Sequence, residues 1–600
     1  MTDVEETFSP MFCFQCEQTM GGVACTQSGR CGKSPRIAYL QDEIICGMKS
    51  MAVWLRALQQ SGQAVPPEYA ELLCYSAFVT LTNVNFDDTS HRTCLSRLAE
   101  KRDEVRHLVE EEYRRKAAAM PALTSAFAEW TPEWPQTKTR IDVDIRRRGR
   151  TIASLQQWII YGLKGMASYS YHIQRLGRRC EGALNHIVEA LAFLVCLPPV
   201  PTPISRTPFG MMGGLHQADD PSDQEALFNM VLKTGEVNLE TMRVLDQCHC
   251  ETFGNPEPTP VRRTHVRGHC IAVSGHDLLD LRDVLEATKD IPDLKVYTHG
   301  EMLPLSGYPG LKKYPHFVGH YGTAWQNQTK DFSNFPGAIL MNTNCLMPVN
   351  ELYRDRIFTC GPVGFPGVRH LGDGNLRPLI DRALELPGFP DDETPERFYT
   401  VGFGHHAIEA VAGKVVEAVK AGKIRRFFLV GGCDGFEPSR NYYTEFAERI
   451  PKDCVVLTLA CGKYRLNHLD FGDIDGIPRL LDCGQCNDAY SAIVVAVLLS
   501  KAFGCGVNDL PLSIILSWFE QKAVVILMTL LSLGIRNMRI GPSLPGFFTP
   551  EILKMLKDRF NLMPIRTPEG DLAECLGGGQ PAATSTETAT TAPPTTPAPA

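Results

Sequence analysis

An excess of positive charge is the first feature that this chain of 600 residues lacks. Lysine and arginine number 60 against 68 aspartates and glutamates, which gives a formal net charge of −8 at pH 7. A protein that clamps nucleic acid or lies on an anionic membrane needs a net positive face. We therefore expect neither a nucleic acid nor a membrane among its partners.

Long hydrophobic runs and a leader segment are lacking as well. The longest apolar stretches, residues 492–499 and 523–535, are shorter than the about 18 residues of a membrane-spanning helix, so they predict buried core helices. The first ten residues, MTDVEETFSP, contain no basic segment followed by an apolar one, so we expect no signal peptide. These absences predict a cytoplasmic protein.

Nucleotide-binding motifs are the third absence. The sequence has no G-x-x-x-x-G-K-[ST], so nucleotide hydrolysis is not indicated. Residues 402–407, GFGHHA, match the loose dinucleotide fingerprint, but no carboxylate follows at a strand end about 20 residues later except near Cys433. We interpret this segment as an ordinary turn between a strand and a helix. Without a flavin or nicotinamide site, electrons have to come from another protein.

Cysteine, in contrast, is abundant. The chain has 21 cysteines, or 3.5% of its residues, which is still far below the roughly 8–10% of a disulfide scaffold. In a reducing compartment disulfides are disfavoured, and clustered cysteines indicate metal binding or redox chemistry.

Hydrophobic periodicity divides the chain into two kinds of structure. Between residues 36 and 195, apolar residues recur at spacings of three and four, which is typical of amphipathic helices, and prolines between 121 and 135 separate two helical bundles. From about residue 261, short apolar runs alternate with amphipathic helices, as in doubly wound parallel sheets. The expected strands are residues 270–273, 295–297, 338–341, 398–401, 427–430 and 455–459.

The predicted fold class is therefore α plus α/β, with N-terminal helical bundles followed by two doubly wound, Rossmann-like parallel-sheet domains. A break rich in proline and aspartate at 387–395 separates the two sheets, and the last residues lack the large apolar side chains that offset ordering entropy. The predicted boundaries are a helical domain at 1–255, α/β domains at 256–388 and 389–576, and a disordered tail at 577–600.

Four cysteines near the N-terminus form a compact motif. Cys13, Cys16, Cys25 and Cys31 have the spacing C-x2-C-x8-C-x5-C, so four thiolates lie close enough in sequence to surround one centre. Structural zinc usually takes two short-spaced pairs, whereas an iron–sulfur cubane tolerates irregular intervals. The spacing favours an iron–sulfur cluster, with zinc as the first alternative and free thiols as the second.

A second set of metal-ligand residues follows the predicted strands. In open parallel sheets, ligands bind outside the carboxyl ends of the strands, so side chains at these ends are candidates to converge. Cys486 lies in a tight turn that contains glycine, and Glu520 lies in an apolar helix, where an unpaired carboxylate is costly to bury. The residues that directly follow predicted strands are His276, Glu301, Cys345, Cys433 and Cys461.

Each of these residues alone is better explained as a buried thiol or a hydrogen-bonded histidine. Their repeated strand-end position, together with a carboxylate in an apolar helix, favours a shared site. Thiolates suit iron–sulfur and other soft centres, whereas carboxylate and imidazole suit harder, oxygen-bearing iron. The mixed set predicts a cluster that is part sulfide and part oxo, with one iron open to a small nitrogen or oxygen ligand.

Longer motifs in a fixed order carry a family resemblance. They are MFCFQCEQT, SGHDLLDL, THGEMLP, MNTNC, VGGCDG, RNYYTEFA, LACGKYRLNHLDFGDIDGIPRLLD, GQCNDAYSA and SWFEQKAVVIL. In this order they resemble the motifs of the hybrid cluster protein family, also called prismane proteins or hydroxylamine reductases. The resemblance runs from residue 11 to about residue 566 and so covers the chain except for its tail.

The resemblance implies two iron–sulfur centres. It implies a 4Fe–4S cluster on Cys13, Cys16, Cys25 and Cys31, since the eight-residue middle interval is similar to the branch with that cluster rather than the 2Fe–2S branch. In the family, the cysteine that corresponds to Cys433 can carry an extra sulfur as a persulfide. The resemblance also implies a hybrid 4Fe–2S–2O cluster with the ligands His276, Glu301, Cys345, Cys433, Cys461, Cys486 and Glu520.

One residue departs from the family pattern. Cys483 forms C-x2-C with Cys486, where the family usually has an aliphatic residue. Because the context GQCND matches the family at Cys486, we expect Cys486 to be the ligand and Cys483 to be a packed thiol.

The activity implied by the resemblance is the reduction of a small nitrogen oxide, either hydroxylamine to ammonia and water or nitric oxide to nitrous oxide. Electrons would enter at the cubane from a ferredoxin-like protein or an NADH-dependent reductase. Glu301, His276 and Glu520 would shape the open iron, and a released carboxylate among them would relay protons. The alternatives are a nickel carbon monoxide dehydrogenase-like enzyme, which shares the fold, and a redox sensor that scavenges nitric oxide or transfers nitrosyl groups.

Overall fold

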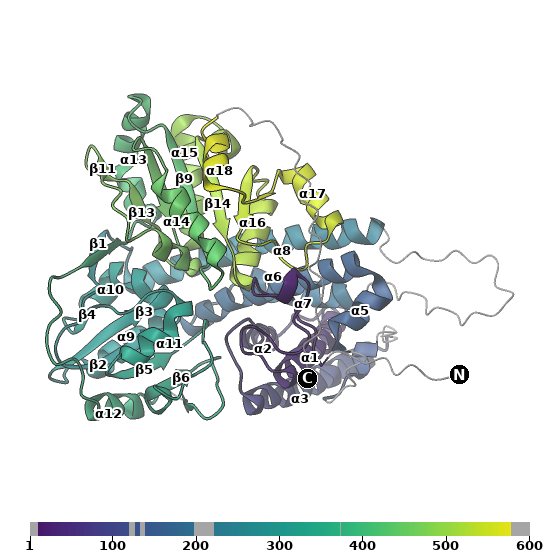
Figure 1. Cartoon of the computed structure of the whole chain (residues 1–600). Helices are drawn as coiled ribbons and strands as arrows, with labels where there is room; N and C mark the ends of the chain where they lie inside the picture. The colour runs from purple at the N-terminus through teal and green to yellow at the C-terminus, as the bar shows by residue number, and fades with distance from the viewer. Residues whose placement is uncertain (1–9, 119–125, 133–138, 197–220, 373, 578–600) are drawn as a thin grey trace, which may run out of the picture.

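The computed structural model describes residues 10–118, 126–132, 139–196, 221–372 and 374–577. The chain has a helical N-terminal part, drawn in purple and blue, and two α/β parts in teal and in green to yellow (Figure 1). The predicted tail from residue 578 onward and the prolines at 121 and 135 lie outside the described residues.

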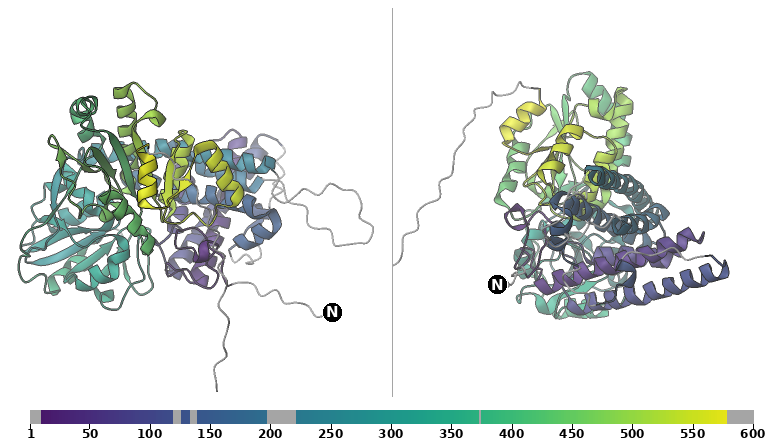
Figure 2. Two further views of the ribbon diagram at one scale, coloured as in Figure 1. Left: turned by 45° about the horizontal axis from the view of Figure 1, so that its top comes forward. Right: turned by 90° about the vertical axis from the view of Figure 1, so that its right-hand side faces the viewer.

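The N-terminal part consists of long helices with clear start signals. Ser34 and Asp87 accept hydrogen bonds from backbone N–H groups in the first turns of α1 and α3, as N-cap residues do. Helix α1 packs along α3, and the two lie side by side in Figure 2. The helices are α1 (Pro35–Gln60), α2 (Pro67–Val79), α3 (Asp88–Arg115), α5 (Ile141–Arg148), α6 (Arg150–Arg175), α7 (Glu181–Cys196) and α8 (Pro221–Phe253).

Helix α6 joins the helical part to the second α/β part. It is buried on nearly all sides, because it packs against α2, α7 and α8 and also against α16 (Gln521–Ser532) of the C-terminal half. Gly165 allows this contact, since a Cβ there would lie 2.4 Å from the Gln521 carbonyl oxygen. The start of α16 is therefore fixed against the helical part.

A buried histidine gives the helical part a pH dependence. The Nε2 atom of His186 on α7 lies 2.9 Å from the hydroxyl of Thr234 on α8. Burial, aided by the charge of Lys233, lowers the pKa of His186 to about 4 from its ordinary 6.5. Between these values the unfolded chain binds more protons than the folded one. The free energy of unfolding should therefore fall as the pH falls through this window, by about 2 kcal/mol at pH 5.

Urea unfolding of the wild-type protein and of His186→Gln, each at pH 7 and pH 5, measures this contribution. Glutamine does not titrate, so the variant should lose about 2 kcal/mol less than the wild type between the two pH values. Equal losses in the two proteins would show that the folded state protonates His186 as readily as the unfolded state does.

The first α/β part is built on a six-stranded sheet in the order β4-β3-β2-β5-β6-β7, and every pair of neighbours is parallel. Its strands are β2 (His269–Ser274), β3 (Leu294–His299), β4 (Phe317–His320), β5 (Ala338–Met341), β6 (Ile357–Cys360) and β7 (Arg369–Leu371). The α-helices between and after them are α9 (Leu278–Thr288), α10 (Pro309–Lys312), α11 (Gln328–Asn334) and α12 (Arg377–Glu385).

The second α/β part repeats this plan, with a parallel six-stranded sheet in the order β13-β10-β9-β14-β15-β16. Its strands are β9 (Arg426–Gly432), β10 (Cys454–Thr458), β13 (Leu480–Asp482), β14 (Leu512–Ser517), β15 (Met538–Gly541) and β16 (Met563–Pro564). Besides α16, its α-helices are α13 (His405–Lys420), α14 (Asn441–Glu448), α15 (Ala489–Phe503), α17 (Pro550–Phe560) and α18 (Pro568–Cys575).

These two sheets confirm the predicted fold class, and the strands expected at 270–273, 295–297, 338–341, 427–430 and 455–459 are all present. The strand expected at 398–401 also exists, as β8 (Phe398–Val401), but it pairs antiparallel with β1 (Thr259–Arg262) outside both large sheets. Gly402 follows β8 with φ +90°, and a Cβ there would lie 1.9 Å from the Glu257 carbonyl oxygen. Close backbone packing therefore accounts for this glycine. The predicted domain boundaries stay predictions.

One helical stretch of the described chain, Cys486–Phe503, is long and apolar enough to span a membrane by length and composition alone. It contains α15, which packs against α13 and α8. Val495 and Leu499 on this helix are buried. The helix is longer than the apolar run at 492–499 from which it was predicted.

Candidate metal centres

The N-terminal cysteines lie in a loop before α1. Cys13 and Cys25 face each other in an isolated antiparallel bridge, in which each backbone N–H donates to the other's carbonyl at 3.1 and 2.8 Å. Cys16, Cys25 and Cys31 are buried, and Cys13 is half-buried. The loop thus brings the quartet predicted from spacing to one place, although its role as a ligand set stays a prediction.

Lys33 places a buried positive charge beside the thiols of this loop. Burial raises the pKa of the Cys16 thiol, and the nearby thiols of Cys31 and Cys13 raise it further, because neighbouring thiolates repel one another. The ammonium of Lys33 lies 3.8 Å from the Cys13 Sγ. Burial alone would lower the pKa of Lys33, but the surrounding thiols outweigh it and the pKa is raised, so Lys33 stays charged. The loop therefore supplies a buried cation to a cluster of sulfur ligands.

The second predicted set lies at the carboxyl ends of strands from both large sheets. Because all these strands are parallel within their sheets, their carboxyl ends share an edge. Each member of the set follows one such end: His276 follows β2, Glu301 β3, Cys345 β5, Cys433 β9, Cys461 β10, Cys486 β13 and Glu520 β14.

Three of these side chains converge closely. Ligand atoms of His276, Glu301 and Cys486 all lie within 4.8 Å of one another, and all three residues are buried. The Cys486 backbone N–H donates to Glu301 Oε2 at 2.9 Å. The other carboxylate oxygen, Glu301 Oε1, is buried with no hydrogen-bond partner among the described residues. A buried carboxylate oxygen without a donor is costly, so it indicates a place for a cation.

His276 is oriented by a neighbouring strand end. Its Nδ1 lies 2.9 Å from the Thr343 hydroxyl, and its backbone N–H donates to Asn342 Oδ1 at 3.1 Å. Burial lowers the pKa of His276 well below its ordinary value, and the charge of Lys522 lowers it further. A neutral imidazole held at one nitrogen presents the other nitrogen to a metal, as histidine ligands do.

The remaining cysteines surround an aromatic pair. Cys345, Cys433 and Cys461 pack together with Trp325 and Phe519, whose rings are 4.3 Å apart between centroids. Burial raises the pKa of all three thiols, for Cys433 to about 12, and nearby carboxylates raise it further. Thiols in this environment ionise only beside a strong positive charge, so their chemistry suits metal binding rather than free thiolate reactivity.

The structure corrects the predicted position of Glu520. We expected this residue inside an apolar helix, but the residues before it form β14, and Glu520 is the N-cap of α16. Its Oε2 accepts a hydrogen bond from the Lys522 backbone N–H at 2.9 Å. The sequence did not reveal this boundary, because periodicity alone does not distinguish a buried strand from a buried helix in a short apolar run.

The donor chemistry fits a multi-iron group. The second site offers four thiols, two carboxylates and one imidazole, all buried or half-buried, and one oxygen of Glu301 has no hydrogen-bond partner within the described ranges. Sulfur, oxygen and nitrogen donors together suit iron with both sulfide and oxo bridges. The N-terminal loop offers sulfur donors only, as an iron–sulfur cubane requires.

Some residues at the second site were missed by sequence reasoning. Lys522 is fully buried, and its Nζ has no hydrogen-bond partner in the described part of the chain. Its position, two residues after a buried glutamate in an apolar run, was the signal available.

Cys483 is buried, and its Sγ lies 3.8 Å from the Leu481 carbonyl oxygen, in agreement with a packed thiol.

An apolar cavity reaches the second site, and a polar cavity lies near it. An apolar cavity of about 640 Å³ lies between α15, α16 and the strands β9, β10 and β14, and both Cys433 and Cys486 are in its wall. A second cavity of about 610 Å³ has polar walls, which include Asp434, Arg465 and His468. Small molecules therefore have room beside the ligand set.

Comparisons with known proteins cover nearly the whole chain. The model of the Prismane/CO dehydrogenase family matches residues 11–573. The chain is 46% identical over 578 residues to a hydroxylamine reductase of Acidiphilium cryptum, covering 94% of this chain and 99% of that protein. It is 47% identical over 569 residues to a hydroxylamine reductase of Syntrophobacter fumaroxidans, covering 94% and 100% of the two chains.

Among solved structures, the fold is similar to carbon monoxide dehydrogenase IV of Carboxydothermus hydrogenoformans. The TM-score is 0.52 at 15% identity, with 96% of this chain and 94% of that chain covered. A Ni-free carbon monoxide dehydrogenase of Thermococcus sp. AM4 gives a TM-score of 0.51 at 14% identity, with 96% and 92% covered. At such identity the likeness concerns the fold alone.

Proposed function

The chain belongs to the Prismane/CO dehydrogenase family, and from this premise we propose that it is an iron–sulfur oxidoreductase that reduces hydroxylamine to ammonia and water. The observation that carries the proposal is the convergence of His276, Glu301 and Cys486, with one oxygen of Glu301 that has no hydrogen-bond partner among the residues that the structure describes. Hard oxygen and nitrogen donors beside buried thiols suit an iron that a small nitrogen compound can reach.

Two sets of residues would hold the metal. Cys13, Cys16, Cys25 and Cys31 would bind a 4Fe–4S cluster, beside the buried ammonium of Lys33. The seven residues at the strand ends would bind a hybrid 4Fe–2S–2O cluster. When bound, these groups supply electrons and a Lewis-acidic iron for cleavage of an N–O bond.

The side chains of the second site have distinct tasks in this proposal. Thr343 fixes the ring of His276, so that its other nitrogen stays directed to the metal. Reduction of hydroxylamine to ammonia and water takes up two electrons and two protons. Glu520 is suited to carry a proton, because burial raises the pKa of its carboxyl. Trp325 and Phe519 exclude water from the thiol side of the site.

The cavities support a small substrate. The apolar cavity beside Cys433 and Cys486 admits uncharged molecules, which suits neutral hydroxylamine and also suits nitric oxide. Nitric oxide, reduced to nitrous oxide, is therefore the second candidate substrate.

Electrons would enter at the N-terminal loop. Met20 and Val23, which lie between the second and third cysteines of the quartet, are exposed apolar side chains. Exposed apolar residues next to a redox centre suit a transient contact with a donor protein. We propose a ferredoxin-like protein or an NADH-dependent reductase as this partner.

Anaerobic purification followed by iron quantitation, EPR and steady-state assays tests the proposed function. We expect about eight irons per chain in two distinct centres, and sustained hydroxylamine turnover with a chemical reductant. One zinc or no iron would contradict the proposal. Stoichiometric nickel would instead indicate an enzyme like carbon monoxide dehydrogenase. Turnover that stops after about one equivalent per centre would indicate a sensor or scavenger of nitric oxide.

A further inference from the structure

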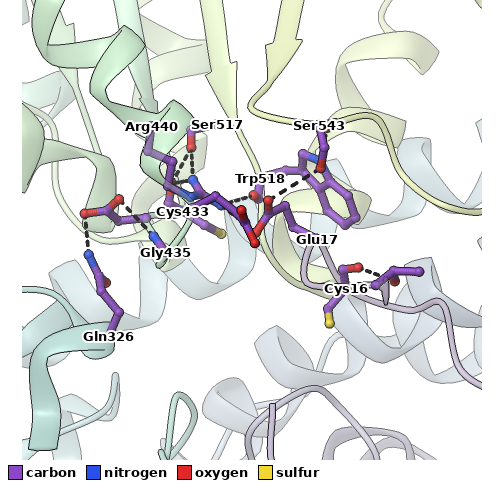
Figure 3. A network of polar contacts seen from close by, with 12 residues as sticks. Cys16, Glu17, Gln326, Cys433, Gly435, Arg440, Ser517, Trp518 and Ser543 are labelled. Atoms are coloured by element: carbon purple, nitrogen blue, oxygen red, sulfur yellow. Dashed lines mark hydrogen bonds and ion pairs between the residues drawn. The ribbon is translucent and has the colours of Figure 1, made fainter. Parts of the chain in front are cut away.

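A buried arginine lies between the two candidate metal centres (Figure 3). The side chain of Arg440 is completely buried. Its Nη1 donates to the Cys433 carbonyl at 3.0 Å and to the Ser517 hydroxyl at 2.6 Å. Its Nη2 donates to the Trp518 carbonyl at 2.8 Å. One guanidinium thus holds the backbone of a predicted ligand, Cys433, and of the segment that leads to Glu520.

The same guanidinium is paired with the N-terminal loop. Arg440 Nη2 lies 3.2 Å from Glu17 Oε2, and the Glu17 side chain is only 1% exposed. Glu17 directly follows Cys16, and its backbone N–H donates to the Phe519 carbonyl at 3.0 Å. Phe519 directly precedes Glu520. The N-terminal loop is therefore joined to the segment before Glu520 by one backbone hydrogen bond, and to Arg440 by one ion pair between side chains.

An ion pair at such depth has a different role from one at the surface. Loss of one partner leaves the other as an uncompensated buried charge, which is strongly unfavourable. The planar guanidinium also has a fixed fork of donors, which lysine cannot reproduce. Without Glu17, Arg440 has to move towards another acceptor or towards water, and either movement releases the carbonyls of Cys433 and Trp518.

We propose that Glu17 and Arg440 are positioning residues that make the geometry of the second metal centre depend on the N-terminal cysteine loop. This inference rests on the proposed function, because it assigns metal to both sets of ligands. Neither residue is a ligand: Glu17 lies beside the first centre and acts, through Arg440, on the second. The pair accordingly couples two centres that are far apart in sequence.

The test compares Glu17→Gln and Arg440→Lys with the wild-type holoenzyme, purified anaerobically. Both variants should keep the EPR signal of the N-terminal centre. The EPR signal of the second centre should change, and hydroxylamine turnover should fall by about 10-fold or more, as for other changes that orient metal ligands. The matched control is Glu437→Gln, whose partner Arg30 lies next to Cys31 in an exposed pair. This control should match the wild type, because exposed ion pairs contribute little.

A merely structural role would lower the melting temperature of Glu17→Gln but leave the second-centre spectrum of the loaded molecules unchanged, and this result would overturn the inference. The double variant Glu17→Gln/Arg440→Met removes both charges. It should fold better than Arg440→Met alone while its second-centre spectrum still differs from that of the wild type. Failure of the proposed function shows separately, as a wild-type enzyme that contains both centres but does not reduce hydroxylamine.

Discussion

Replacement of Glu301 by glutamine should lower hydroxylamine turnover by at least about 100-fold, since even changes in groups that only orient metal ligands cost 10- to 100-fold. The glutamine amide oxygen can still accept the hydrogen bond that the Cys486 N–H gives to Glu301 Oε2. An NH₂ group then takes the place of the unpartnered Oε1, and an amide nitrogen is no ligand for iron. The glutamine side chain thus keeps the shape of Glu301 but lacks the second carboxylate oxygen that would bind iron.

Spectroscopy shows where this effect arises. The EPR signal of the second centre should change or disappear in Glu301→Gln, while the signal of the N-terminal centre stays as in the wild type. Glu236→Gln is a matched control, because Glu236 is exposed and pairs with Lys233 on the surface of α8. Wild-type turnover and an unchanged second signal in Glu301→Gln would remove Glu301 from both the ligand set and any proton relay.

The convergence of the second site could be predicted from the sequence because it follows from topology. Strands of a parallel sheet end at a common edge, so residues such as His276, Glu301 and Cys433, each directly after a predicted strand, had to lie near that edge. The prediction needed only the strand ends, and buried strands are clear as short apolar runs bounded by glycine. That residues of two separate sheets share one site did not follow from the pattern; the family resemblance implied it through a ligand set drawn from both α/β parts.

Other features depend on contacts that no local pattern contains. The short outer strands, such as β7 and β16, lack a long enough apolar run to be predicted. The predicted position of Glu520 inside a helix was wrong, since β14 and α16 are both rich in apolar residues and a short apolar run does not distinguish a buried strand from a buried helix. Arg440 reads in the sequence as an ordinary polar residue before a helix. Its function as a link to Glu17 becomes visible only once residues more than 400 positions apart are placed together.

Loss of the buried ammonium of Lys522 should have the second largest effect. Burial alone would lower the pKa of Lys522, but the thiol of Cys486 and the carboxyl of Glu520 outweigh burial, so the pKa is raised and the side chain stays charged. Lys522→Met preserves length and burial but leaves the anionic ligands without this cation. Two unit charges about 4 Å apart interact by about 4 kcal/mol at an effective dielectric constant near 20, and the energy falls with distance. The midpoint potential of the second centre should therefore become more negative by on the order of 100 mV.

Redox titration followed by EPR measures this shift, and iron quantitation should show a lower content in Lys522→Met because the repulsion between ligands is no longer offset. Lys522→Arg keeps the charge, so its potential should lie closer to that of the wild type. Lys554→Met, at an exposed lysine on α17 that pairs with Asp558, serves as the control and should leave the potential unchanged. If Lys522→Met kept both the midpoint potential and the iron content of the wild type, the prediction would be wrong, and the charge of Lys522 would have no effect on the second centre. Lys522, whose Nζ has no hydrogen-bond partner in the part of the chain that the structure describes, would then stabilise no ligand, although a buried charge is among the most costly groups to retain in a protein interior.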